Sequence, residues 1–130
     1  MSNISAYLSK AYLDWCLGGA AATQPASRFI GLAVGAPSSI SGSEVATGSG
    51  YARSTGSFGA AASPAGSASN NAAVTFGPFS TAYSITGIHV WDTSGTAGNM
   101  LWYGNLTTAR TVASGDQLVL AVGALVITLA

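Results

Sequence analysis

Charged residues are scarce in this 130-residue chain. Asp, Glu, Lys and Arg make up 6% of it, against roughly 25% in an ordinary soluble domain. Four basic and four acidic residues give a net charge of about zero, and no two basic residues are neighbours. A nucleic-acid site needs clustered Lys and Arg to displace the counterions of phosphate, so we expect no nucleic-acid partner. A net charge near zero instead favours association with other protein.

Histidine and cysteine occur once each. Cys16 cannot form an internal disulfide, and no basic residue stands beside it in sequence, which favours a buried, inert thiol over a nucleophile. A metal site would need three or four ligands, and no cluster of them is visible. His89 lies alone in a predicted strand, which is typical of a half-buried structural residue. We therefore expect no metal, no cofactor and no enzymatic activity.

Long hydrophobic runs are also missing. The longest, Leu118 to Ala130, has 13 residues and contains Gly123. A transmembrane helix needs about 20 residues, so no membrane span is predicted. The N-terminus has no basic start followed by an apolar run, as a signal peptide would. We expect a chain that is made and kept in a cytoplasm or in particles assembled there.

Apolar stretches of strand length, separated by Gly, Ser, Thr and Pro, fill most of the chain. Residues 28–35 predict a buried strand, and residues 83–91 alternate like a strand with two different faces. Residues 99–130 add three or four strands, with Gly123 as the turn between Leu118–Val122 and Ala124–Leu129. The remaining segments predict strands at 48–58 and 71–76 and an exposed loop at 59–69. Seven to nine short strands indicate a mainly β domain, an antiparallel β-sandwich or jelly-roll-like fold, over residues 20–130.

One helix is predicted at residues 3–17, within an N-terminal unit spanning residues 1–19. Five residues share one helical face: Ile4, Leu8, Ala11, Tyr12 and Trp15. Ser2 or Asn3 can cap its start, and Gly18-Gly19 can end it. Leu13, Cys16 and Leu17 widen the apolar surface beyond this stripe. We therefore expect the helix to be held on more than one side, by its own sandwich or by a neighbouring subunit.

Two other arrangements could carry chemistry. Glu44, Asp92 and Asp116 could form a glycosidase-like carboxylate pair, but each lies in a predicted turn or loop, where acids are common. Four aromatic residues could form a sugar-stacking platform, but packing in a core or an interface is the favoured interpretation. These are Tyr51, Trp91, Trp102 and Tyr103.

Four segments resemble one family of small tailed-bacteriophage virion proteins, variously labelled tail fibre, minor tail or head decoration proteins. They are Glu44-Val-Ala-Thr-Gly-Ser-Gly-Tyr-Ala-Arg53, Ser69-Asn-Asn-Ala-Ala-Val-Thr-Phe76, Leu101-Trp-Tyr-Gly-Asn-Leu-Thr-Thr108, and Val112-Ala-Ser-Gly-Asp116 with the following Gly123-Ala-Leu-Val-Ile-Thr-Leu129. The likeness covers nearly the whole chain. Its motifs are turn and strand signatures, so it bears on fold and setting more than on role.

The resemblance implies a non-enzymatic virion structural protein on the capsid or tail surface, assembled in the cytoplasm of the bacterial host. A capsid decoration (cement) protein that stabilises the head is expected first. The alternative is a tail-associated, tail-fibre or receptor-binding module, and only then would a glycan receptor be expected. The expected partners are the major capsid protein or tail proteins, and copies of the chain itself. Five residues are predicted to form the interface: Tyr7, Leu13 and Leu17 on the helix, then Arg53 and Arg110.

Overall fold

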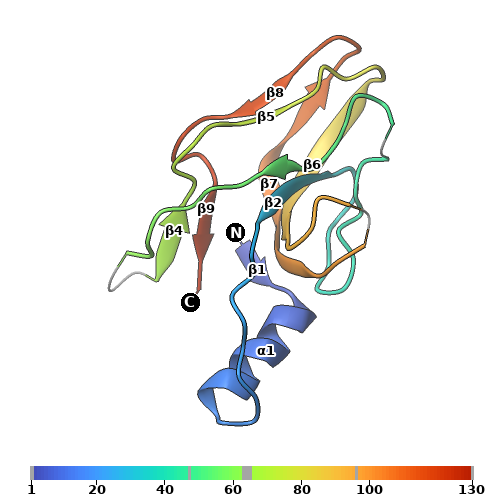
Figure 1. The fold of residues 1–130 in the computed structure, drawn as a ribbon. Coiled ribbons are helices and arrows are strands. Elements are labelled where there is room, and N and C mark those ends of the chain that lie inside the picture. The colour runs from blue at the N-terminus through green and yellow to red at the C-terminus, as the bar shows by residue number, and fades with distance from the viewer. Residues whose placement is uncertain (1, 47, 63–65, 96, 130) are drawn as a thin grey trace.

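The computed structural model describes residues 2–46, 48–62, 66–95 and 97–129, and it confirms a mainly β, antiparallel fold with a single long helix (Figure 1). The elements in chain order are β1 (Ser2–Ile4), α1 (Ala6–Cys16), β2 (Phe29–Ala33), β3 (Ser54–Thr55), β4 (Ser67–Ser69), β5 (Val74–Phe76), β6 (Tyr83–Trp91), β7 (Met100–Val112), β8 (Leu118–Leu120) and β9 (Val126–Thr128). In the described part of the chain, no helix is both long enough and apolar enough to cross a membrane.

The main sheet has five strands in the order β1-β7-β6-β2-β3, and every neighbouring pair is antiparallel. The predicted strands at 28–35 and 83–91 are confirmed as β2 and β6, which pair from Phe29 opposite Trp91 to Ala33 opposite Gly87. β6 lies at the centre, with β2 on one side and the long β7 on the other. Its residues 87–90 are all buried, so both of its faces are covered there.

Two short ribbons, β5–β8 and β4–β9, complete the fold (Figure 1). The hydrophobic core joins the main sheet to these ribbons: Ile30, Leu32, Ile88 and Val90 belong to the same buried cluster as Val74 and Phe76. Leu118, Leu120, Leu125 and Ile127 pack against this cluster from the C-terminal segment while remaining partly exposed. The C-terminal ribbons therefore form an incomplete cover over the sheet.

The C-terminal strands differ in part from the prediction. Gly123 does occupy a turn, with a φ of +79° that favours glycine. However, β8 and β9 do not pair with each other. β8 pairs with β5 and β9 with β4, so the predicted exposed loop at 59–69 contains strand β4. The chain around Gly123 instead passes from the β5–β8 ribbon to the β4–β9 ribbon. Residues 63–65 of that predicted loop lie outside the described residues.

The N-terminus also differs from the prediction of a helix from residue 3. Residues 2–4 form β1 and pair with β7, with Ile4 opposite Trp102. The helix begins at Ala6, and its N-cap is Ser5, whose Oγ accepts a hydrogen bond from the Leu8 amide at 3.1 Å. The predicted glycine at the C-terminal end is confirmed, since Gly18 has a φ of +82°. In residues 2–4, hydrogen bonding to β7 therefore decides the structure, although the apolar periodicity of the sequence also fits a helix.

A buried asparagine clamps the two ribbons together. The Asn70 side chain donates to the carbonyls of Ala72 and Ala121, both at 2.9 Å, and accepts from the Leu125 amide at 2.9 Å. Its own backbone bonds Leu125 and Gly123. Asn70 is 1% exposed, so these bonds replace all contact with water.

We predict that Asn70→Ala lowers the free energy of unfolding by about 2–4 kcal/mol, because three backbone groups lose a buried partner and a cavity forms. Urea denaturation followed by circular dichroism measures the change. Asn71→Ala is the matched control, since Asn71 is exposed and should change stability by less than about 0.5 kcal/mol. Equal effects of the two substitutions would contradict the clamp.

Candidate functional site

A buried ion pair lies beside the end of β2. The Arg53 guanidinium donates two parallel hydrogen bonds to Glu44, Nε to Oε1 at 2.8 Å and Nη2 to Oε2 at 2.7 Å. The side chain of Arg53 is 2% exposed and that of Glu44 is 18% exposed. Removing two charges from water is costly, so such a pair persists only where its geometry satisfies both partners. Here the two-pronged contact meets that condition.

Arg53 also holds the loop between β6 and β7. Its Nη1 donates to the Thr93 carbonyl at 3.0 Å and to the Gly95 carbonyl. Its carbon Cζ lies 3.9 Å from the centre of the Trp91 ring, a cation–π contact. One guanidinium therefore joins the 44–53 segment to the β6–β7 loop, which is 40 residues away in the chain.

Tyr51 completes the pair from the other side. Its hydroxyl donates to Glu44 Oε1 at 2.8 Å and accepts from the Leu32 amide at 3.0 Å. Burial raises the pKa of the Tyr51 hydroxyl above its ordinary value. Burial also raises the pKa of Glu44, but the hydrogen bonds from Arg53 and Tyr51 and the Arg53 charge outweigh it, so the Glu44 pKa is lowered. Glu44 is therefore a carboxylate at neutral pH.

His89 packs against this group and is fully buried rather than half-buried as predicted. Its ring lies between Gly31 and Gly42, where a Cβ on either glycine would overlap it. Its Nδ1 accepts from Trp91 Nε1 at 2.6 Å, whereas Nε2 has no hydrogen-bond partner in the part of the chain that the structure describes. Burial lowers the pKa of His89 to about 4, against an opposing effect of the Glu44 charge. The imidazole is therefore neutral at pH 7.

Two of the candidate aromatic residues, Tyr51 and Trp91, belong to this group, whereas the candidate acids Asp92 and Asp116 bond within their own turns. Asp92 accepts from Asn99, and Asp116 accepts from the Ala113 amide at 2.9 Å, so each acid stabilises its own turn. Tyr51 stacks on Phe76, with ring centres 6.1 Å apart. Among the described residues, no group of three or more His, Cys, Asp or Glu side chains could hold a metal ion.

The arrangement around Arg53 acts as an internal clamp. Its guanidinium contacts Glu44 and the carbonyls of Thr93 and Gly95, which lie in two loops, and Trp91, which lies in a strand. An interface role for Arg53 stays a prediction, whereas these internal contacts are observed. Sequence reasoning missed the clamp because the pairing of Arg53 with Glu44 depends on how two irregular segments lie beside β2.

We predict that Arg53→Met lowers the free energy of unfolding by about 3–5 kcal/mol, because it leaves the Glu44 carboxylate partly buried and unpaired. The double variant Arg53→Met/Glu44→Gln should regain part of this loss. Denaturant titration measures both variants. Arg110→Met, at an exposed position, is the control and should lie within about 0.5 kcal/mol of the wild type. An Arg53→Met variant as stable as the Arg110→Met control would refute the clamp.

The buried histidine predicts loss of stability in mild acid. Its folded pKa is depressed, so the unfolded chain binds the extra proton between about pH 6.5 and pH 4, and stability falls as pH falls through this window. The loss is on the order of 2–3 kcal/mol, at about 1.36 kcal/mol per pKa unit. Urea midpoints from pH 8 to pH 4 measure it, and His89→Gln should flatten the profile. An imidazole that titrates near pH 6.5 by NMR in the folded wild type would contradict the prediction.

The helix α1 exposes several large apolar side chains. It contains no buried residue, although apolar side chains occupy most of its circumference. The predicted interface residues Tyr7, Leu13 and Leu17 are 50%, 52% and 79% exposed. Tyr12 and Trp15, expected on the inner stripe, are 45% and 58% exposed. A helix that is apolar nearly all round is normally buried, so α1 presents a surface suited to a partner.

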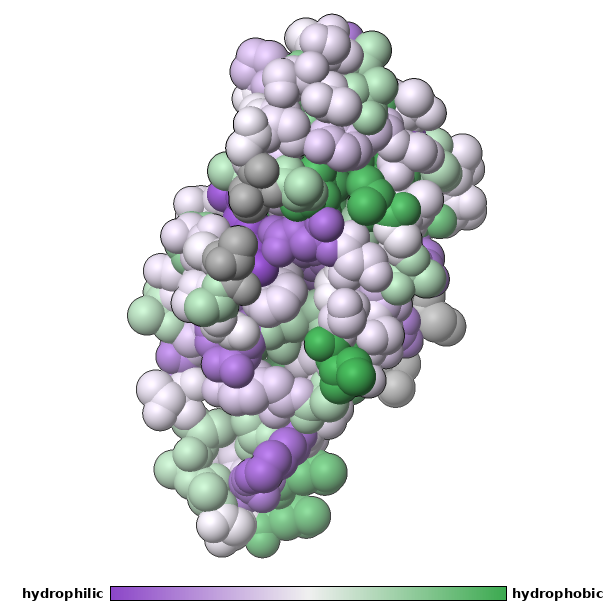
Figure 2. All heavy atoms as spheres, turned by 90° about the vertical axis from the view of Figure 1, so that its right-hand side faces the viewer, coloured by the Kyte–Doolittle hydropathy of each residue, from purple (hydrophilic) through white to green (hydrophobic). Residues whose placement is uncertain are grey.

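Figure 2 shows this end of the molecule, with hydrophobic surface beside a hydrophilic strip at the bottom of the view, where α1 lies in Figure 1. The charges on the helix are Lys10 and Asp14, which form an ion pair with each other. Cys16 is exposed, contrary to the predicted buried thiol. A hollow of about 560 Å³ lies between one side of the helix and residues 20–25.

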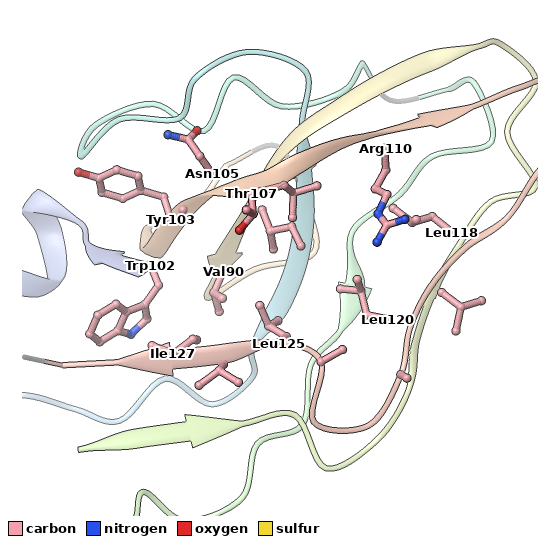
Figure 3. Close-up of a pocket in the computed structure, with 17 residues that line it drawn as sticks. Val90, Trp102, Tyr103, Asn105, Thr107, Arg110, Leu118, Leu120, Leu125 and Ile127 are labelled. Atoms are coloured by element: carbon pink, nitrogen blue, oxygen red, sulfur yellow. The ribbon is translucent and has the colours of Figure 1, made fainter. Parts of the chain in front are cut away.

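A second apolar feature is a groove of about 610 Å³ between β6–β7 and the β8–β9 segment (Figure 3). Its walls carry Val90, Trp102, Leu118, Leu120, Leu125 and Ile127. Thr107 and Arg110 point into it from β7 (Figure 3). The exposed Arg110 side chain makes no hydrogen bond or ion pair with any described residue. The groove, which we call the β7–β9 groove, thus combines an aliphatic floor with one unpaired cation.

The five predicted interface residues therefore lie in three different places. Tyr7, Leu13 and Leu17 lie on the helix, Arg110 lies at the β7–β9 groove, and Arg53 lies in the buried clamp. Sequence reasoning could not find the groove, because its walls come from strands that pair elsewhere.

Comparison with known proteins gives one family. A family model described as Podophage GP4 fiber I protein gp80 matches residues 3–128. The match begins within β1 and includes the helix, the other strands of the main sheet and both ribbons. No curated protein matches the chain in sequence.

Proposed function

The chain belongs to the Podophage GP4 fiber I protein gp80 family, and from this premise we propose that it is a structural subunit of a tail fibre in a bacteriophage virion. The observation that carries the proposal is the family match over nearly the whole chain. Membership in a family of phage virion proteins also agrees with the resemblance carried by the turn and strand segments. The description of that family as a fibre protein favours the tail alternative over capsid decoration, which stays a prediction.

The geometry supports a role in assembly. The helix exposes five large apolar side chains, and the surface elsewhere is rich in Ser, Thr, Ala and Gly, which cost little entropy to bury. The buried Arg53 guanidinium is paired with the partly buried Glu44 carboxylate, so neither charge needs a partner from outside the chain. We infer that neighbours in the virion, whether tail proteins or copies of this chain, contact Tyr7, Leu13 and Leu17. No catalytic step enters this proposal.

The size of the chain limits it to one part of a fibre. The helix of 11 residues is about 16 Å long at 1.5 Å per residue, and the strands are short, so one copy supplies a compact module rather than a shaft. We propose that several copies, or one copy joined to other fibre proteins, build the fibre.

The proposal predicts where the protein lies on the particle. Antibody against the purified chain, detected with gold in negatively stained virions, should label the tail. Quantitative mass spectrometry of purified virions gives the copy number, which should be far below the hundreds of copies expected of a head decoration protein. Label found only on heads, with hundreds of copies, would instead support the capsid decoration protein and overturn the fibre role.

A further inference from the structure

Two apolar surfaces of opposite shape remain uncovered on one copy of the chain. The convex one is the outer face of α1, formed by Leu13, Cys16 and Leu17. The concave one is the β7–β9 groove. The helix leaves the main sheet beside Trp102 and extends beyond the strands at the lower end of the view (Figure 1). Each surface is therefore free to meet a second copy.

We propose that the outer face of α1 from one copy docks into the β7–β9 groove of a second copy, as the self-association contact of the fibre. The inference rests on the proposed fibre role for its setting, but its evidence lies in the fold. A single kind of contact then covers both exposed apolar surfaces. Packing α1 against another α1 would cover the helix and leave the groove open.

The shapes suit a helix in a groove. Leu13 and Leu17 are four residues apart and project from the same side of α1, which is the spacing that helices use as anchors in apolar grooves. The groove, at about 610 Å³, is within the size range of sites that hold several such groups. Its aliphatic walls, including Leu120, Leu125 and Ile127, match leucine anchors better than they match a polar ligand.

The charges are also complementary. Arg110 at the groove has no partner among the described residues. Glu44 is held by Arg53, while Asp92 and Asp116 each accept backbone hydrogen bonds in their own turns. Asp14 is held instead by Lys10, whose side chain is 79% exposed. Asp14 is therefore the carboxylate that can turn toward an outside cation at the smallest cost, and it lies next to Leu13 in the docking helix.

The available area sets the strength of the contact. On the docking face, Leu13 and Leu17 are 52% and 79% exposed, and these two side chains alone supply much less than the roughly 800 Å² per partner of a stable interface. With the rim of the groove included, we expect a dissociation constant on the order of micromolar. Since helix and groove are different surfaces, the contact is heterologous, and it propagates through several copies or closes into a ring.

The decisive experiment is complementation between two variants. Leu13→Glu/Leu17→Glu removes the helix anchors and leaves the groove intact. Thr107→Trp fills the groove mouth at an exposed position and leaves the helix intact. Sedimentation velocity should find the wild type associated at about 100 μM, each variant monomeric alone, and a dimer when the two are mixed. Ile40→Glu, at a residue 83% exposed on another loop, is the control and should associate like the wild type.

A charge exchange tests the polar contact. Arg110→Asp should weaken association about tenfold, and Asp14→Arg should do likewise. In the double variant the two charges are exchanged, so the ion pair can form again. Its dissociation constant should lie within about threefold of that of the wild type. Circular dichroism must give every variant the wild-type spectrum. A double variant weaker than either single one would overturn the Asp14–Arg110 contact.

Two results would overturn the docking contact while leaving the fibre role intact. One is a wild type that stays monomeric at ten times the expected dissociation constant, although gold still labels the tail. The other is association that survives Thr107→Trp but is lost with Leu13→Glu/Leu17→Glu, since helix-to-helix packing would behave in this way. Conversely, complementation together with label only on heads would overturn the fibre role and keep the contact.

Discussion

The bidentate contact between Arg53 and Glu44 organises one whole side of the molecule. It joins the segment beside β2 to the β6–β7 loop, places a cation over Trp91, and, through Glu44 and Tyr51, reaches the backbone of β2. Two ion pairs form among the described residues, and the Arg53–Glu44 pair is the one that lies largely inside, between irregular segments. The 44–53 segment is also held by packing, since Val45 and Tyr51 belong to the buried core, and the polar contact fixes this segment relative to the β6–β7 loop.

On the opposite side of the sheet, the contacts are apolar rather than polar, and they leave part of the core surface exposed to water. Leu118, Leu120, Leu125 and Ile127 cover the core only in part, since β8 and β9 each pair with a short strand and cannot widen the main sheet. The helix is likewise attached to the sheet through Ser5 and β1 while its own side chains stay exposed. An isolated copy thus leaves apolar surface in contact with water at two places, which association would remove.

The sequence predicted the fold class and the central strands because their signals are local. Alternation across residues 83–91 and the apolar run at 28–35 correspond directly to β6 and β2. The start of the helix was wrong because Ile4 fits a helical stripe as well as it fits a strand, and only pairing with Trp102 decides between them. The partners of β8 and β9, the clamp on Arg53 and the glycines around His89 depend on contacts between distant segments, which no local pattern contains. The exposure of Tyr12 and Trp15 could not be predicted either. A periodic apolar stripe indicates that a helix packs against something, but not whether that partner belongs to the same chain.

These features explain why such a protein can carry so little charge. A subunit that must meet other copies loses free energy when it buries unpaired charges, whereas neutral side chains can enter an interface without that cost. The chain keeps the Arg53–Glu44 pair inside, pairs Lys10 with Asp14 on the helix, and leaves Arg110 at the rim of an apolar groove. In the proposed docking contact, apolar area supplies most of the attraction, and the single charge of Arg110 fixes the orientation of the partner. The scarcity of charge is thus compatible with the proposed contact, because close packing between two copies would bury few unpaired charges.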